Sequence, residues 1–447
     1  GGPTGTQPPS GVDILPARKR EACSSILRKS TLRERLGRTA GSRGITNFPD
    51  GNPRHVKLAL IGLGNAGGKI VDELLRHEAE LSRSVVESAV AINTARVDLA
   101  RLEQLPSESR FLVGQTHERV KGHGAGGDPD LGASVIRSDQ AEIDRALDRV
   151  PPYAVDAFWV VAGLGGGTGS GGAPVVAEQV AARYDPPVYG LGVLPSESEG
   201  GRAALNAARS LRSFADAADN LVLFDNAAWQ ANDDSLEAGY ARANREVSTR
   251  IMRLLSAGTV DGSTLSENAM DASDINRTLS SGGVSTIAYA ETADPSAGGR
   301  GLLSRLAGNN DTDTDDDADP ATVVSGLIRE AVNSRLTCPA AVDTAERALI
   351  VLSGSPSSLS RKGLEAGRRW VESEIESAEV LAGDDPRENA DVLSAVVLLS
   401  TVTDVPRVEA LQAQAVDAKE TIAEQASLRE SATNDLITDD DDQLDPV

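Results

Sequence analysis

The residue types best suited to chemistry gather in one turn, GGGTGSG at residues 165–171. The pattern predicts a buried strand before the turn, over 157–162, and a helix after it, from about Gly172. Because the turn has almost no side chains, its backbone N–H groups can approach an anion closely, and a helix N-terminus adds unpaired donors and partial positive charge. Thr168 and Ser170 add hydroxyl donors. A flexible linker has similar composition but would not normally connect a strand and a helix so tightly, so the turn is interpreted as a phosphate cradle.

A second glycine loop, GLGNAGG at residues 62–68, connects a predicted strand over 56–61 with a predicted helix over 69–80. G-x-G-x-x-G after a strand is the fingerprint of dinucleotide-binding proteins, which also need an acidic residue at the end of the second strand. Here that strand, predicted over 85–92, is followed by the uncharged Asn93. The Walker phosphate-loop motif is also incomplete, because Lys69 would need a glycine where Leu63 stands and a Ser or Thr where Ile70 stands. The loop therefore completes neither of the standard single-loop motifs.

A third glycine-rich loop, KGHGAGGDPDLG at 121–132, follows a predicted strand over 111–113. This loop is flexible enough to wrap a terminal phosphate. His123 is a catalytic candidate, although a single histidine in a mobile loop is more often incidental. Asp128 and Asp130 suit a hydrated Mg²⁺ and equally suit a solvated turn.

The alternation of strands and helices predicts an α/β fold, in which a doubly wound, Rossmann-type parallel sheet carries these loops at the carboxyl ends of its strands. Further strand-end loops follow at 190–201 and at 225–226. A long helix over 235–257, about 34 Å at 1.5 Å per residue, is expected to span between two domains. A smaller α/β domain follows, with strands at 284–289, 347–353 and 391–399, helices at 321–335 and 360–374, and a closing amphipathic helix at 408–429.

The composition limits the classes of partner. The 447 residues carry a net charge of −23, which excludes nucleic acid as a default partner. Seven lysines stand against 37 arginines, and scarce lysine with high acidity fits a cytosol of molar salt. Two cysteines allow at most one disulfide, and no apolar run is long enough to cross a bilayer, so we expect a cytoplasmic protein. The basic segment 1–54 is expected to be a disordered leader; the alternative is a short amphipathic helix at 27–36 on a membrane or an acidic partner.

The glycine loops together resemble the tubulin/FtsZ superfamily. The segments AGLGGGTGSGGAPVVA, VYGLGVLP, NLVLFDNAAW and SGGVSTIAYA are most similar to CetZ, its tubulin-like branch in halophilic archaea. The resemblance covers about residues 56–430 and implies a GTP-binding cytoskeletal protein that polymerises through self-association. It implies a GTP-binding domain over 55–234, a connecting helix over 235–258 and a C-terminal activation and assembly domain over 259–430. Composition and charge add the leader over 1–54, an acidic loop at 292–320 and an acidic tail over 431–447 that is open to further partners.

The resemblance also assigns roles by position. It implies that GTP or GDP is bound, with Mg²⁺ held through water and with no protein ligand to the metal. The residues implied to contact the phosphates are Gly62, Gly64, Asn65, Ala66, Asn93, Gly124, Ala125, Gly126, Gly127, Gly166, Gly167, Thr168, Gly169, Ser170 and Gly171. Glu199 matches the ribose contact, Asn226 and Asn244 the guanine-reading asparagines, and Tyr240 the ring that stacks on the base. Tyr240 and Asn244 lie one helical turn apart, so both can face one ligand.

The catalytic residues implied by the resemblance are Asp271 and Asp274, which one subunit would present to the nucleotide of its neighbour. Two carboxylates three residues apart near a helix start share a face and can orient an attacking water. A helix cap with a dipole-compensating acid explains the same pattern. The chain departs from the family at two positions, since CetZ proteins usually carry Glu where Asp274 stands and FtsZ proteins carry Asn where Ala269 stands.

Three functions remain open from the sequence. The first is an assembly-dependent GTPase that polymerises head to tail and supports cell shape. The second is a GTP-binding regulator that neither assembles nor hydrolyses appreciably, and the third is a dinucleotide-dependent enzyme using the loop at 62–68. Concentration-dependent GTP turnover separates the first two, and nicotinamide binding would support the third.

Overall fold

The computed structural model describes residues 56–81, 84–229, 235–257, 270, 272–295, 319–377, 379–388 and 390–438. The expected leader at 1–54, most of the expected acidic loop at 292–320, the segment 439–447 and Asp271 lie outside the described residues. Among the helices that are described, none is long and apolar enough to span a membrane.

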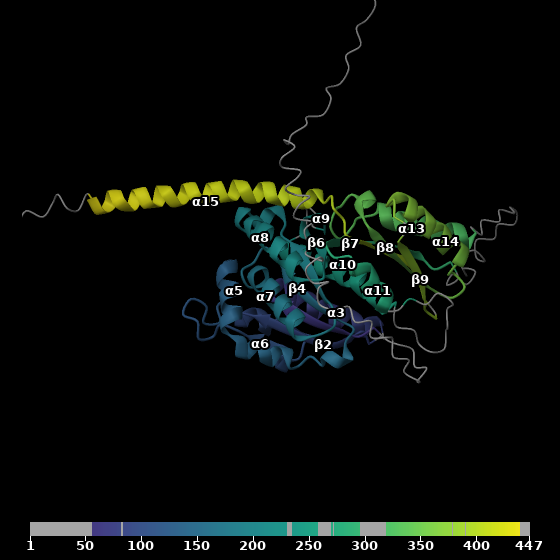
Figure 1. Ribbon diagram of the computed structural model, residues 1–447, viewed down its shortest axis with the longest axis horizontal. Helices are drawn as coiled ribbons and strands as arrows, with labels where there is room; N and C mark the ends of the chain where they lie inside the picture. The colour runs from purple at the N-terminus through teal and green to yellow at the C-terminus, as the bar shows by residue number, and fades with distance from the viewer. Residues whose placement is uncertain are drawn as a thin grey trace, which may run out of the picture.

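The first half of the chain is an α/β sandwich built on parallel strands (Figure 1). Its elements are β1 (Leu58–Leu63), α3 (Gly64–Leu81), β2 (Val86–Asn93), α4 (Arg96–Ala100), β3 (Arg110–Leu112), α5 (Pro129–Ser138), α6 (Gln140–Leu147), β4 (Ala157–Gly163), α7 (Thr168–Arg183), β5 (Val188–Leu194), α8 (Gly201–Ala217), β6 (Asn220–Asp225), α9 (Asn226–Trp229) and α10 (Leu236–Ser256). The strand order is β3-β2-β1-β4-β5-β6. This confirms the predicted α/β sheet with its loops at the carboxyl ends of parallel strands.

Alternation along the central strands divides the core into two layers. In β1, Ala59, Ile61 and Leu63 belong to the cluster that α5, α7 and α8 complete. Leu58 and Leu60 belong to the opposite cluster, which α3 and α10 complete. Both sets are buried, as expected for a parallel strand covered by helices on both faces. Helices therefore cover both faces of the sheet up to the ends of the strands.

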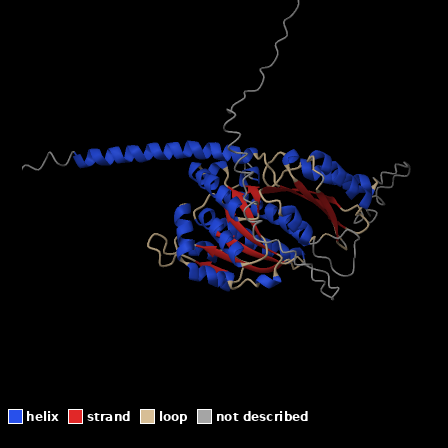
Figure 2. Ribbon diagram, viewed as in Figure 1, coloured by secondary structure: helices blue, strands red, loops and turns tan. Residues whose placement is uncertain are grey.

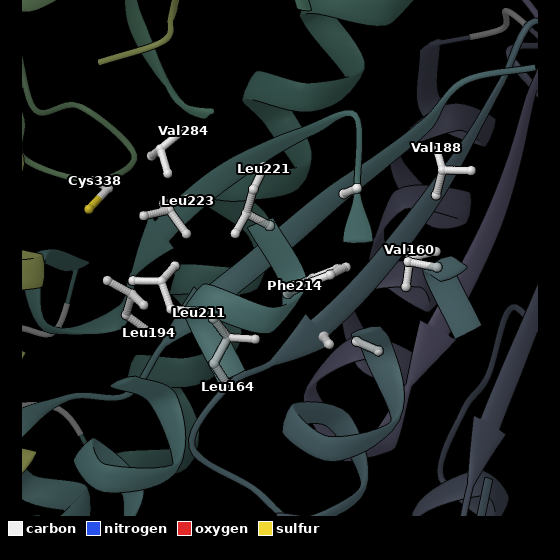
Figure 3. Packing of buried hydrophobic residues seen from close by; sticks show 14 of the residues in the cluster. Val160, Leu164, Val188, Leu194, Leu211, Phe214, Leu221, Leu223, Val284 and Cys338 are labelled. Carbon is white, nitrogen blue, oxygen red and sulfur yellow. The ribbon is translucent and has the colours of Figure 1, made fainter. Parts of the chain in front are cut away.

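Figure 3 shows how the first of these layers is filled. Phe214 and Leu211 of α8 lie over Leu221 and Leu223 of β6, and all four are fully or almost fully buried. Burying side chains of this size contributes about 1.5–3 kcal/mol each. This packing fixes α8 against the sheet directly beside the glycine turn.

The second half of the chain continues the same sheet (Figure 2). Its elements are α11 (Ala272–Leu279), β7 (Val284–Ala293), α13 (Pro320–Asn333), β8 (Arg347–Gly354), α14 (Arg361–Glu374), β9 (Val380–Pro386), β10 (Val392–Ser400) and α15 (Pro406–Thr438). β7 pairs with β6 in parallel through two residue pairs, beginning at Val284, and then runs antiparallel to β10. β10 is antiparallel to β8, and β9 completes the edge in parallel with β8.

Four elements differ from the sequence prediction. β7 runs to Ala293, four residues beyond the predicted end at 289 and into the expected acidic loop. α7 begins at Thr168, four residues before the predicted start at Gly172. The edge strand β9 was not predicted. The closing helix α15 runs to Thr438 and thus includes residues assigned to the tail; it is amphipathic only in its first turns, where Val408 and Leu411 are buried. The helix then runs along α8, where Ala415 is buried and Ala418 lies against Gly201, and its last turns extend past the body of the molecule (Figure 1).

Candidate nucleotide-binding site

A pocket of about 420 Å³ lies at the carboxyl ends of β1, β2, β4, β5 and β6, against the start of α10. The three glycine loops form one part of its wall, and the first turns of α9 and α10 form another. The predicted site residues that line it are Gly64, Asn65, Ala66, Asn93, Gly124, Ala125, Gly126, Gly127, Gly166, Gly167, Thr168, Gly169, Glu199, Asn226, Tyr240 and Asn244. The fold thus brings together residues that are up to 180 positions apart in the chain.

The glycines of this pocket have the geometry of a phosphate cradle. A Cβ added at Gly166, Gly126 or Gly127 would meet no atom within 4 Å, so these residues leave open space beside the pocket. At Gly64, in the loop that begins α3, a Cβ would lie 2.9 Å from the Gly169 backbone nitrogen, so there the backbones of two loops are in contact. Side chains are therefore absent both where a ligand would approach and where the two loops touch each other.

The N-terminus of α7 supplies the donors of this cradle. No side chain caps the helix, so its first N–H groups have no partner from a capping residue. The Thr168 hydroxyl lies 2.6 Å from that of Thr94, and both residues are buried. This hydrogen bond fixes the first residue of α7 against the end of β2. The pocket therefore fits an anion by backbone donors and helix polarity.

Three predicted residues lie outside the pocket lining. A Cβ on Gly62 would be 2.7 Å from the Gly67 carbonyl oxygen, and one on Gly171 would be 1.9 Å from the Pro129 carbonyl oxygen. Both glycines therefore serve helix packing. The Ser170 hydroxyl donates to the Gly166 carbonyl within the same turn, which directs it into the helix. These three residues therefore have a packing role, because they allow neighbouring backbone segments to approach closely around α3 and α7.

The loop at 121–128 is held to the end of β2. The Arg96 N–H donates to the Gly122 carbonyl at 2.9 Å, and the Gly124 N–H donates to the Thr94 carbonyl at 3.1 Å. Asp128 caps α5 by accepting from the Leu131 N–H at 3.0 Å. That hydrogen bond, with a contribution from Arg119, lowers the pKa of Asp128 below its usual range.

The opposite end of the pocket carries the side chains expected to contact a base and a sugar, Glu199, Asn226, Tyr240 and Asn244. Glu199 accepts from the Ser196 N–H at 2.8 Å in a capping box, which fixes its carboxylate at the pocket wall. Burial, together with the nearby carboxylate of Glu199, raises the pKa of Tyr240 to about 12. Tyr240 and Asn244 lie on one face of α10, and Asn226 begins α9 directly after β6. All four side chains line the same pocket.

The structure adds pocket residues that sequence reasoning missed. Lys69 lies one turn inside α3, and Asp98 receives a hydrogen bond from the Asn93 amide at 3.3 Å. His123, interpreted as incidental, also lines the pocket. Asn206 of α8 donates to the carbonyls of Gly127 at 2.9 Å and Gly165 at 3.0 Å, and so connects two glycine loops from behind. In the sequence, the glycine-rich loops pointed to Lys69 and His123, whereas nothing local indicates Asp98 or Asn206.

The two expected catalytic acids lie apart from this pocket. Asp274 is in the first turn of α11, and it is not among the residues that line the pocket. α10 begins at the pocket and runs for 21 residues, and α11 follows after its far end. Asp271 is outside the described residues. No group of three or more potential metal ligands occurs in the part of the chain that the structure describes.

Comparison with known proteins agrees with this architecture. Residues 57–234 match the Tubulin/FtsZ family GTPase domain, and residues 233–417 match the C-terminal domain of tubulin-like CetZ. The chain is 47% identical to tubulin-like protein CetZ1 of Haloferax volcanii over 373 residues, which cover 83% of this chain and 94% of that protein. It is also 47% identical to CetZ3 of the same organism, over 88% of this chain and 100% of that protein.

Solved structures show the same similarity. The GDP-bound monomer of CetZ1 from Haloferax volcanii superimposes with a TM-score of 0.71 at 42% identity, covering 81% of this chain and all of that one. The GTPγS-bound protofilament of CetZ2 from the same organism gives a TM-score of 0.70 at 38% identity, covering 82% of this chain and all of that one. The fold, the domain matches and the sequence identity agree, and the chain belongs to the CetZ family of tubulin-like proteins within the tubulin/FtsZ family.

Proposed function

We propose that this protein is a cytoplasmic GTPase that binds GTP in the glycine-lined pocket and assembles head to tail into filaments that support cell shape. The observation that carries the proposal is the two-ended pocket. One end offers backbone donors and helix polarity to phosphates, and the other offers two asparagines, a tyrosine and a carboxylate. The related CetZ1 is described with GDP, and CetZ2 as a protofilament with GTPγS.

We assign the roles within the pocket by the chemistry of each group. Gly64, Asn65 and Ala66 line the α- and β-phosphates, Gly166–Gly169 form the main cradle through their N–H groups, and Asn93 and the loop Gly124–Gly127 lie towards the γ-phosphate. Asn226 and Asn244 read the guanine edge because amides both donate and accept hydrogen bonds. Tyr240 stacks on the base and Glu199 accepts from the ribose hydroxyls.

Mg²⁺ fits this site as a hydrated ion held mainly by the phosphates. Near the phosphate loops the wall offers this ion only the neutral oxygens of Asn65, Asn93 and Thr168, and the lining carboxylates are Asp98 and Glu199. Asp98 is the nearer to the phosphate loops because it bonds to Asn93 at the end of β2. The Asp128 carboxylate, a sequence candidate for this ion, instead caps α5. Bound Mg²⁺ would neutralise phosphate charge.

Hydrolysis requires a second copy of the chain, because the pocket is without the expected catalytic acids. Asp274 is placed after the far end of α10, on an element that does not reach the pocket of its own chain. A neighbour stacked on the nucleotide-bearing end would bring its own Asp271 and Asp274 to the phosphates, where carboxylates can orient the attacking water. Contacts of this heterologous kind do not close on themselves and give a filament.

A GTP-binding regulator without turnover is the second candidate. It is favoured by one observation, the aspartate at position 274 in place of the longer glutamate usual in the family. The shorter side chain reaches less far across a subunit interface.

The decisive experiment measures GTP turnover per subunit against protein concentration, in molar KCl with Mg²⁺. Wild type is compared with Asp274→Ala and with Asp148→Ala, an exposed acid that follows α6 and does not line the pocket. We expect specific activity to rise with concentration, to collapse in Asp274→Ala despite intact GTP binding, and to be unchanged in Asp148→Ala. Turnover that is absent or independent of concentration, with GTP still bound, would replace the filament GTPase by the regulator.

A further inference from the structure

One buried arginine connects α15 to the walls of the nucleotide pocket. Arg407, the second residue of α15, has only 9% of its side chain exposed. Its Nε donates to an Asp225 carboxylate oxygen at 3.0 Å, and its Nη2 donates to the Pro195 carbonyl at 2.7 Å. Pro195 lines the pocket, and Asp225 immediately precedes the pocket residue Asn226. A single guanidinium therefore contacts the ends of two neighbouring strands.

The first of these contacts sets the start of α9. Asp225 is 3% exposed, and the oxygen that receives Arg407 also accepts from the Ala227 N–H at 3.2 Å. The Asp225 N–H donates to the Thr337 carbonyl at 2.8 Å, which fixes the residue from the other side. Burial raises the pKa of Asp225, and the charge and hydrogen bond of Arg407 oppose that shift, so the arginine favours the charged form of the capping carboxylate. The orientation of Asn226 depends on this cap.

The second contact, from Arg407 to the Pro195 carbonyl, fixes the turn that carries Glu199. Pro195 follows the last residue of β5, and the next residue opens the capping box that holds Glu199 against the pocket. A carbonyl fixed at Pro195 therefore fixes the beginning of the turn that carries Glu199. The guanidinium joins this turn to Asp225 because its planar fork can donate to two acceptors at once, which an ammonium group on one flexible stem does less well.

The last residue of α9, Trp229, is held by a second arginine. The Trp229 carbonyl accepts from Nε and Nη2 of Arg242 at 3.2 and 3.0 Å. Arg242 lies on α10 between Tyr240 and Asn244, so this contact relates the two elements that carry the base-binding residues. Arg407 fixes the first end of α9 through Asp225, and it belongs to α15, which does not line the pocket.

We propose that Arg407 is a positioning residue for nucleotide recognition, which sets the base contact of Asn226 and the ribose contact of Glu199 together. The inference rests on the proposed binding of GTP and extends it to a residue that touches no part of the ligand. It makes the first turn of α15 a determinant of nucleotide specificity. Loss of Arg407 lets both strand-end loops shift, while the glycine cradle around the phosphates stays in place.

The test is a comparison of dissociation constants for GTP, ITP and 2′-deoxyGTP, measured on the full chain with the wild type and Arg407→Lys. ITP lacks the exocyclic amino group of guanine, and 2′-deoxyGTP lacks one ribose hydroxyl. We expect the preference of the wild type for GTP over both analogues to fall about tenfold in the variant, the size of one ordinary hydrogen bond. The affinity for ITP itself should change much less, because the phosphates keep their cradle.

The matched control is Arg387→Lys. The Arg387 Nε lies 2.7 Å from Asp385, and the two side chains are 14% and 2% exposed, so this pair closely resembles Arg407–Asp225 in chemistry and burial. It lies at the end of β9 and does not line the pocket. We expect a similar loss of thermal stability with unchanged nucleotide preference.

The outcomes separate the two proposals. A wild type that binds none of the three nucleotides overturns the proposed function and this inference with it. A wild type that prefers GTP, with the same preference in Arg407→Lys, overturns the positioning role alone. If Arg407→Lys does not fold, the same ratios are measured on the doubly substituted Asp225→Asn, Arg407→Gln chain, which buries no charge at this position. A lowered preference for GTP in that chain supports the positioning role, and an unchanged preference overturns it.

Discussion

Replacing Gly166 by alanine tests the phosphate cradle without disturbing the fold. Gly166 is exposed, its φ is not positive, and an added Cβ would meet no protein atom within 4 Å. The folded chain can therefore accept the methyl group without strain. Because alanine restricts the unfolded chain more than glycine does, we expect stability to be unchanged or to rise by about 0.4–1 kcal/mol.

GTP binding should respond in the opposite direction. Gly166 lines the pocket directly before the N-terminus of α7, where the proposal places the phosphates. A methyl group there would move a phosphate oxygen away from its N–H donors. The loss of one hydrogen bond to a charged group is about 1.5–3 kcal/mol, which corresponds to roughly 10- to 150-fold weaker binding.

The assay is isothermal titration with GTP in molar KCl, combined with thermal unfolding without nucleotide. Gly326→Ala is the control, because Gly326 is exposed on α13, has no atom within 4 Å of an added Cβ and does not line the pocket. It should gain similar stability and bind GTP normally. Unchanged GTP affinity in Gly166→Ala would refute the assignment of this turn to the phosphates.

Three further predictions concern other parts of the molecule. Gly171→Ala places a methyl group 1.9 Å from the Pro129 carbonyl oxygen, so it should lower stability by about 1–3 kcal/mol or more in denaturant unfolding, in contrast to the tolerated change at Gly166. Lys69→Gln should weaken GTP binding about tenfold at low salt and less at high salt, because its charge acts on the phosphates; equal weakening at both would contradict an electrostatic role. Tyr240 has a pKa raised to about 12 against 10.0 in the unfolded chain, so its contribution to stability is complete below pH 10 and is lost as the pH rises from 10 to 12. The free energy of unfolding of Tyr240→Phe, measured in denaturant against pH, should therefore fall less than that of wild type over that interval. Equal falls in the two chains would show that the Tyr240 phenol does not titrate there.

The glycine loops could be predicted from the sequence because a loop between a strand and a helix is a local pattern. The carboxyl ends of parallel strands meet at one edge, so three such loops had to converge. Asn206 and Arg407 could not be found in this way. Their partners lie 41 to 212 positions away, and nothing in their local sequence indicates a contact with the pocket loops.

The errors in secondary structure have physical causes. Residues 168–172 contain three glycines, which lower helix propensity, yet α7 begins there because its close contact with α5 excludes larger residues. The strand β9 has the sequence VLAGDDP, in which glycine, aspartate and proline all disfavour a strand. It forms at the edge of the sheet, where only β8 must be matched.

The long exposed part of α15 divides the molecule into two regimes of local stability. Val408, Leu411 and Ala415 are buried, whereas every side chain from 419 to 433 is exposed. Amides near Leu411 open only with the body of the protein, so their hydrogen exchange reports global unfolding. Amides beyond Lys419 lie in turns whose side chains are exposed from 419 to 433, so these turns depend mainly on helix propensity, which is marginal in water, and should exchange orders of magnitude faster. Hydrogen exchange along α15 should therefore fall into two classes, slow amides in its buried first turns and fast amides in its exposed part.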